Sequence, residues 1–181
     1  RYALRQDSAG AGTFRGGLRN EQVMRVLSDI MFNTQMERVE CRPWGLFGGL
    51  SAMGNEVALK RADQDEVVYT TGKVFSQMLK AGDTWTLRSG GGGGFGKPTE
   101  REMERVENDV RNGYVSPAAA RQQYGVVIDR STGQADRVLS AQLREQMNRL
   151  GLPADQPYSS PARLLQALQH PGQHRKRLAL L

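Results

Sequence analysis

Five consecutive glycines, Gly90–Gly94, constrain the fold of this chain more than any other feature. Because glycine has no Cβ atom, such a run lets its backbone approach a ligand or another backbone closely, at a large entropic cost in folding. Residues 84–88 before the run have strand composition, and residues 99–102 after it have the form of a capping box. The expected layout is therefore strand, glycine loop and helix, which is also the layout of phosphate-binding loops.

Whether this loop is a phosphate-binding loop depends on the residues at the positions that would contact a nucleotide. Gly91 with Gly96 and Lys97 matches the G-x-x-x-x-G-K spacing, but Pro98 stands where a Ser or Thr hydroxyl should bind Mg²⁺. Proline also lacks an amide hydrogen to donate. We interpret Thr99 as the N-cap of the following helix, whose acidic first turns would repel a triphosphate. The sequence favours a structural turn or a loop packed against another chain.

The composition is that of a globular domain with one hydrophobic core. The chain has 181 residues, 38% of them hydrophobic, and a mean hydropathy of −0.57. No apolar run approaches the roughly 20 residues that a membrane span needs. The single cysteine, Cys41, excludes an internal disulfide and a cysteine-built metal site, so a reducing, cytoplasmic setting is expected.

The basic charge does not indicate nucleic-acid binding, despite a net charge of +6 and a pI of about 9.8. The basic residues are spread along the chain and interleaved with acidic ones, and the only dense cluster, residues 174–177, reads as part of an exposed tail. His170 and His174 are four residues apart, but Pro171-Gly172 breaks the helix between them, so no metal site is expected. Neither nucleic acid nor a membrane is an expected partner.

The order of β-type and helical patterns predicts an α+β fold, with a β-rich part of mainly antiparallel strands followed by three or four helices packing on the sheet. We expect residues 1–98 to form the β-rich glycine-loop region, 99–172 the helical region of the same domain, and 173–181 a basic and apolar tail. Strands are expected within residues 21–30, 36–41, 56–61, 66–71 and 84–88, with 56–61 and 67–71 as a hairpin.

The helices are expected from apolar stripes and end signals. Ser116-Pro117 and Gly125 bound one short helix, before a possible strand at 126–129. Another helix starts at Ser160-Pro161. The expected stripes are Met103, Val106 and Val110, then Leu139, Leu143, Met147 and Leu150.

Four motifs in order resemble the C-terminal part of the hydantoinase B/oxoprolinase family. They are residues 7–18 (DSAGAGTFRGGL), 43–49 (PWGLFGG), 90–96 (GGGGGFG) and 112–117 (NGYVSP). The resemblance runs from about Asp7 to Asp129 and covers only the C-terminal part of a family member. The chain opens without Met, so we expect it to be a fragment or a processed product.

The resemblance implies ATP-driven opening of a cyclic amide ring, such as N-methylhydantoin or 5-oxoproline, by a larger enzyme in which this portion is inactive alone. It implies ATP and a divalent metal in the parent complex, with neither bound to this fragment. The implied partners are a hydantoinase A-type subunit or domain and the upstream part of the same subunit. Two alternatives stay open: a subunit of an acetone carboxylase-type carboxylase, and a non-catalytic assembly module.

The candidate site residues lie on the glycine-rich motifs, and their catalytic roles are not defined by the sequence. Asp7 and Arg15 bracket a glycine turn, where the arginine either holds a substrate anion or fixes the loop itself. Trp44 either walls a pocket or packs in an aromatic turn. Lys97 is a poor candidate for a phosphate ligand, because many relatives carry Asp there. The complete set of candidates for a substrate or interface loop is Asp7, Arg15, Gly16, Gly17, Trp44, Gly92, Gly93, Gly94 and Phe95.

Overall fold

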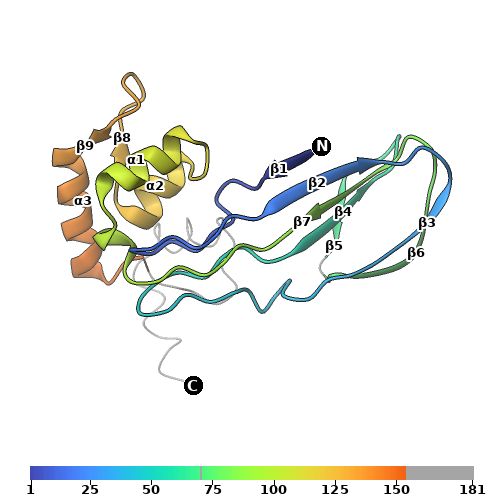
Figure 1. Ribbon diagram of the computed structural model, residues 1–181, viewed down its shortest axis with the longest axis horizontal. Helices are drawn as coiled ribbons and strands as arrows, with labels where there is room; N and C mark the ends of the chain where they lie inside the picture. The colour runs from blue at the N-terminus through green and yellow to red at the C-terminus, as the bar shows by residue number, and fades with distance from the viewer. Residues whose placement is uncertain (70, 154–181) are drawn as a thin grey trace.

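The computed structural model describes residues 1–69 and 71–153, and these form an elongated α+β structure (Figure 1). The main sheet has five antiparallel strands in the order β1-β2-β7-β4-β5. A separate antiparallel pair, β3 and β6, extends to the end of the molecule away from the helices (Figure 1). The strands are β1 Tyr2–Leu4, β2 Asn20–Arg25, β3 Ile30–Gln35, β4 Glu56–Lys60, β5 Val67–Tyr69, β6 Lys73–Leu79 and β7 Thr84–Arg88.

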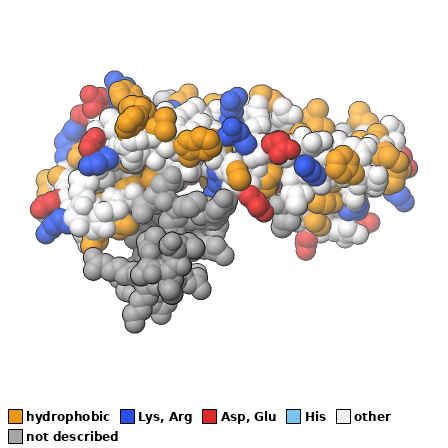
Figure 2. Space-filling view, turned by 90° about the horizontal axis from the view of Figure 1, so that it is seen from below, with side chains coloured by type: hydrophobic (Ala, Val, Ile, Leu, Met, Phe, Trp, Pro, Cys, Tyr) orange, Lys and Arg blue, Asp and Glu red, His pale blue; other side chains and the backbone are white. Residues whose placement is uncertain are grey.

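The β3–β6 pair packs one face against the main sheet. Phe32 and Leu79 are buried from this pair, in the same hydrophobic cluster as Val57 and Leu59 of β4. The Phe32 ring lies 5.5 Å from the Trp85 ring of β7, a distance typical of aromatic packing. The other face of the pair is exposed, and hydrophobic side chains gather over this end of the molecule (Figure 2). The exposed side chains include Met31, Phe75 and Met78.

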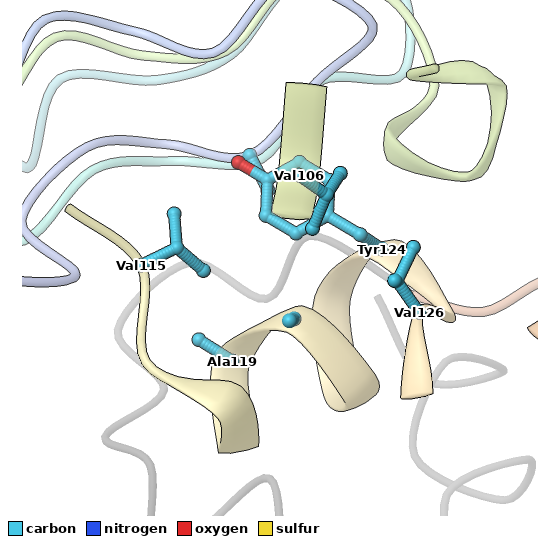
Figure 3. Close-up of a cluster of buried hydrophobic side chains, with 7 residues drawn as sticks. Val106, Val115, Ala119, Tyr124 and Val126 are labelled. Carbon is cyan, nitrogen blue, oxygen red and sulfur yellow. The ribbon is translucent and has the colours of Figure 1, made fainter. Parts of the chain in front are cut away.

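The helical part lies at the opposite end and has its own core. Val106, Tyr124 and Val126 are fully or almost fully buried there (Figure 3). Ala11 of the first glycine-rich motif belongs to the same cluster, so the helices pack against the glycine-rich extension of the sheet. The elements are η1 Pro98–Glu100, α1 Met103–Arg111, α2 Pro117–Tyr124, the two-stranded ribbon β8 Val127–Ile128 and β9 Ala135–Asp136, and α3 Arg137–Leu150.

Several local predictions are confirmed. The fold class is α+β, β4 and β5 form the expected hairpin, and β8 follows α2. The Ser116 Oγ accepts a hydrogen bond from the Ala119 amide at 3.1 Å, and Gly125 ends α2 in the left-handed region at φ 63°. These elements follow short-range signals, which is why the sequence was sufficient to predict them.

Other local predictions were wrong where tertiary contacts prevail. Residues 36–41 form no strand, because Arg38 adopts a left-handed φ of 57° that interrupts an extended backbone. Thr99 does not cap α1; it lies in η1 and donates its hydroxyl to Asn148 Oδ1 of α3 at 2.8 Å. In the α3 stripe Met147 is buried but Leu139 and Leu150 are exposed. The helix expected from Ser160 and the tail at 173–181 lie outside the described residues.

Candidate functional site

Three glycine-rich segments meet where the main sheet joins the helices. We call residues 8–17 the first segment, 45–54 the second and 90–96 the third. The Gly10 amide donates to Gly92 O at 2.8 Å, the Gly94 amide to Leu50 O at 2.9 Å, and the Leu50 amide to Ala11 O at 2.7 Å. Each segment is therefore hydrogen-bonded to both others, and together they form a three-sided bundle, which we call the glycine bundle.

The bundle requires glycine because its backbones are closer than a side chain allows. A Cβ atom on Gly94 would lie 1.9 Å from Ala11 O, and one on Gly93 would lie 1.9 Å from Trp44 O. A Cβ atom on Gly16 would lie 1.9 Å from Gly92 O. Real Cβ atoms do not approach other atoms this closely, so the run of glycines has a packing cause.

Six backbone amides of the third segment, those of Gly90, Gly91, Gly92, Gly94, Phe95 and Gly96, donate to protein acceptors rather than being left free for a phosphate. Gly90 donates to Asn55 Oδ1 at 2.6 Å, and Gly92 to Gly17 O at 2.9 Å. Gly91, Gly94, Phe95 and Gly96 likewise donate to backbone carbonyls of the other segments. Phosphate-binding loops need such amides to be available. The geometry therefore favours the structural interpretation of the run over a nucleotide loop.

Lys97 lies at the surface beside this loop. Its side chain is 67% exposed, and its ammonium is 3.8 Å from Glu100 Oε1, an ordinary surface pair.

The ends of the bundle carry exposed aromatic rings, which we call the aromatic patch: Phe14, Phe47 and Phe95, one from each segment. The Phe95 ring lies 6.3 Å from Phe14 and 5.0 Å from Phe47. The three are 46–78% exposed. Aromatic groups at such exposure are enriched at interfaces between proteins. The glycine bundle thus holds three rings from distant parts of the chain in one contact surface.

Arg15 ties the first segment to α1 rather than facing solvent. Its Nε and Nη2 donate to the two carboxylate oxygens of Asp109, at 3.0 and 3.3 Å. Arg101 Nη2 donates to Asp109 Oδ2 at 3.0 Å, and the three side chains are at most 16% exposed. Arg15 also lies over the Tyr114 ring at 5.5 Å. In this structure the Arg15 guanidinium therefore already binds a carboxylate of the protein itself.

Asp7 has a comparable connecting position. Its Oδ1 accepts from the Ser116 amide at 2.7 Å, and its own amide donates to Tyr114 O at 3.0 Å. Its backbone φ is 59°, in the left-handed region that few non-glycine residues adopt. Asp7, directly before the first segment, therefore contacts the loop between α1 and α2, which is the fourth motif of the sequence. Arg15, within the first segment, contacts α1 through Asp109 and the same loop through the Tyr114 ring.

The structure places the remaining candidates in or beside the bundle. Gly92, in the third segment, faces the first segment, where a Cβ atom on it would lie 3.2 Å from the Gly17 nitrogen. Gly17 is exposed, with no atom within 4 Å of the position that a Cβ atom would take. Trp44 is 65% exposed and faces the Arg38 guanidinium at 5.9 Å. Sequence reasoning missed Asp109, Arg101, Arg38 and Asn55. Asp109 and Arg101 contact the first segment 94 and 88 residues away, and Asn55 accepts from the Gly90 amide 35 residues away. No short motif marks these residues or Arg38.

A row of alternating charges crosses the main sheet next to the bundle. Arg88 of β7 contacts Glu21 and Glu56 of the two flanking strands, β2 and β4, and Glu66, which directly precedes β5. Its distance from Glu21 is 2.7 Å. Burial lowers the pKa of Arg88, but the hydrogen bonds to these carboxylates outweigh burial and raise it overall. The hydrogen bond from Arg88, with that from Arg1, holds the pKa of Glu21 below its usual value. Arg5 also contacts Glu56, at 3.8 Å, so three arginines face three glutamates, as expected for a structural network.

Neither a metal centre nor a membrane span is found in the part of the chain that the structure describes. Within residues 1–69 and 71–153, no group of three or more His, Cys, Asp or Glu side chains could hold a metal ion. Over the same residues no helix is long and apolar enough to cross a bilayer. The described residues do not fit the metal that the resemblance implies for the parent complex, and we derive no metal chemistry from them.

The fold and the glycine bundle define a class: a β-rich structural unit closed by helices, whose glycine-rich motifs serve backbone packing rather than a nucleotide or metal site. The model of the family described as hydantoinase B/oxoprolinase matches residues 1–98. The chain belongs to the hydantoinase B/oxoprolinase family.

Curated relatives agree with this assignment. An uncharacterised protein of Methanocaldococcus jannaschii is 36% identical over 128 residues, covering 70% of this chain and 22% of that protein. The B subunit of a putative D-/L-hydantoinase of Pseudomonas sp. is 30% identical over 71% of this chain and 22% of its own length. The beta subunit of the caprolactamase of Pseudomonas jessenii is 35% identical over 75% and 24%. The chain thus spans between a fifth and a quarter of the length of these relatives.

Two solved structures share the fold. The ATP-dependent caprolactamase of Pseudomonas jessenii superposes with a TM-score of 0.70 at 30% identity, covering 80% of this chain and 25% of that one. A nucleotide-free acetone carboxylase superposes with a TM-score of 0.73 at 22% identity, covering 97% and 27%. The second likeness concerns the fold alone.

Proposed function

We propose that this chain is a portion of a B-type subunit of an ATP-dependent enzyme that opens a cyclic amide ring. The observation that carries the proposal is the family match over the glycine bundle, together with relatives named as the B subunit of a hydantoinase and the beta subunit of a caprolactamase. Hydantoins, lactams and 5-oxoproline share the cyclic amide bond, so ring opening is the common reaction. Ketone carboxylation is the alternative, because the sequence motifs resemble both groups of enzymes.

In this proposal the chain contributes structure and contact surface, while ATP and a divalent metal are handled elsewhere in the assembly. Backbone amides from each segment of the glycine bundle donate to carbonyls of the bundle itself, and Arg15 binds Asp109. The aromatic patch, by contrast, is exposed and can contact a partner. An A-type subunit and the upstream part of the same subunit are the proposed partners. The candidate loop residues Gly16, Gly92, Gly93 and Gly94 then act by shaping this surface.

The partner proposal predicts what copurifies with the full-length protein. A tagged full-length chain from its source should retain an A-type hydantoinase subunit through purification, identified by mass spectrometry. Replacing Phe47, the most exposed ring of the aromatic patch at 78%, by Asp should weaken that retention at least about tenfold. Val138→Asp is a matched control, since Val138 is 69% exposed on α3, in the helical part. Equal retention by both variants would remove the patch from the interface.

A further inference from the structure

A second feature beside the glycine bundle is a pocket of about 380 Å³ at the third segment. This volume lies within the range of roughly 300–1,000 Å³ that is usual for small-molecule sites. It is lined by Arg19, Arg38, Pro43, Asn55 and residues 89–92, with no Asp or Glu among the lining residues. The pocket therefore has cationic walls without a built-in counter-charge.

The backbone around Arg38 is held in an unfavourable conformation. Arg38 has a φ of 57°, in the left-handed region that is unfavourable for a residue with a Cβ atom. Asn55 fixes the turn: its amide donates to Arg38 O at 3.0 Å, and its Nδ2 donates to Glu37 O. Gly54 lets the backbone of the Arg38 turn lie close to the second segment, since a Cβ atom on Gly54 would lie 2.3 Å from Val39 O. The fold thus fixes the position of an exposed arginine.

The two arginines are available to bind an anion. Neither the Arg19 nor the Arg38 guanidinium forms an ion pair with a carboxylate within residues 1–69 and 71–153. The Arg19 backbone is anchored, because its amide donates to Ser8 Oγ at 3.1 Å. Arg38 lies over the Trp44 ring at 5.9 Å, and a guanidinium over an aromatic face keeps its edge donors free.

The surroundings favour a carboxylate over a phosphate. Phosphate sites commonly add backbone amides to their basic side chains. Here the amides of Ser89, Gly90 and Gly91 already donate to Asn20 O, Asn55 Oδ1 and Met53 O, at 3.0, 2.6 and 3.2 Å. Recognition must then come from the guanidinium forks, whose paired N–H groups match the two oxygens of a carboxylate. Pro43, also among the lining residues, supplies an apolar surface for the rest of an organic acid.

We propose that this pocket binds a small organic carboxylate through Arg19 and Arg38, with the organic part next to Pro43. Anion binding in this pocket follows from its lining residues and does not depend on the enzymatic activity proposed above. Opening a cyclic amide produces a carboxylate, so the product of the proposed reaction carries the group that this pocket would bind. The identification of the ligand with that product rests on the proposed function, whereas the pocket itself does not. Failure of binding and failure of ring opening are separately measurable.

The test is a binding titration on the full-length protein with benzoate, its neutral isostere benzamide, and inorganic phosphate, followed by ligand-observed NMR. Benzoate should bind saturably and benzamide at least about tenfold more weakly, because a charge-assisted hydrogen bond contributes about one tenfold step or more. Arg38→Gln and Arg19→Gln should each weaken benzoate binding about tenfold. Arg121→Gln, an exposed arginine on α2, is the control and should change nothing.

Three results would overturn the proposal. Absence of benzoate binding to the full-length protein would mean that the pocket is filled or closed by other parts of the subunit. Equal binding of benzoate by the parent protein and both pocket variants would place binding elsewhere. Phosphate binding tighter than benzoate, and lost in the same variants, would make this a phosphate site.

Discussion

Replacing Gly94 by Ala is expected to destabilise the protein by about 3 kcal/mol, the upper end of the usual cost of overpacking, because the atoms that the new side chain meets belong to the backbone. The added Cβ atom would lie 1.9 Å from Ala11 O and 2.4 Å from the Ala11 carbonyl carbon. Neither the Ala11 nor the Gly94 backbone can move away easily, since Leu50 donates to Ala11 O and accepts from the Gly94 amide. Urea unfolding of the purified protein measures the loss, and soluble yield should fall with it.

Gly17→Ala is the matched control in the same bundle. No atom lies within 4 Å of the added Cβ position, and the residue is not in the left-handed region. Its free energy of unfolding should stay within about 0.5 kcal/mol of the parent, the range of ordinary surface substitutions. If Gly94→Ala were as stable as Gly17→Ala, the glycine bundle would not be close-packed, and the glycine run would need another explanation.

Replacing Asp109 by Asn should cost about 3–5 kcal/mol, the usual penalty for removing one member of a buried ion pair. Asp109 is 10% exposed in its side chain and is the carboxylate between Arg15 and Arg101, which are 16% and 9% exposed. Its loss leaves two buried guanidinium groups without a counter-charge. Hydrogen exchange should then increase first in the amides of α1 and of the first segment, which this contact joins.

The comparison for Asp109 is a surface pair on the same helical region. Glu102 pairs with Arg105 at 2.8 Å, but the two side chains are 69% and 58% exposed. Exposed pairs contribute about 0–1 kcal/mol, so Glu102→Gln should be nearly neutral. Equal losses for Asp109→Asn and Glu102→Gln would mean that the Arg15–Asp109–Arg101 contact does not hold the first segment to the helices.

The sequence was informative where a structure depends on neighbouring residues. The strand before Gly90, the cap at Ser116 and the end of α2 at Gly125 all follow short-range rules. The sequence also predicted that the glycine run is structural, from the missing hydroxyl at Pro98 and the acidic residues that follow. The resemblance placed the chain in its family, which the family match confirms.

The sequence could not predict which segments the glycines bring together. Each glycine-rich motif is explained only by contacts with two others about 40 or more residues away, and no local pattern specifies such partners. Arg15 was interpreted as either an anion ligand or a loop anchor, and its Asp109 partner is 94 residues away. Thr99 had the right spacing for a helix cap, but its hydroxyl donates instead to the side chain of Asn148, 49 residues away.

The most direct test of the proposed function is ATP hydrolysis by the assembly purified through the full-length protein. We expect hydrolysis to depend on a cyclic amide, with caprolactam, N-methylhydantoin and 5-oxoproline tested one at a time and the ring-opened acid formed in step with ADP. Acetone with bicarbonate should not stimulate it. Stimulation by acetone and bicarbonate alone, or ATP turnover indifferent to every cyclic amide tested, would contradict the account.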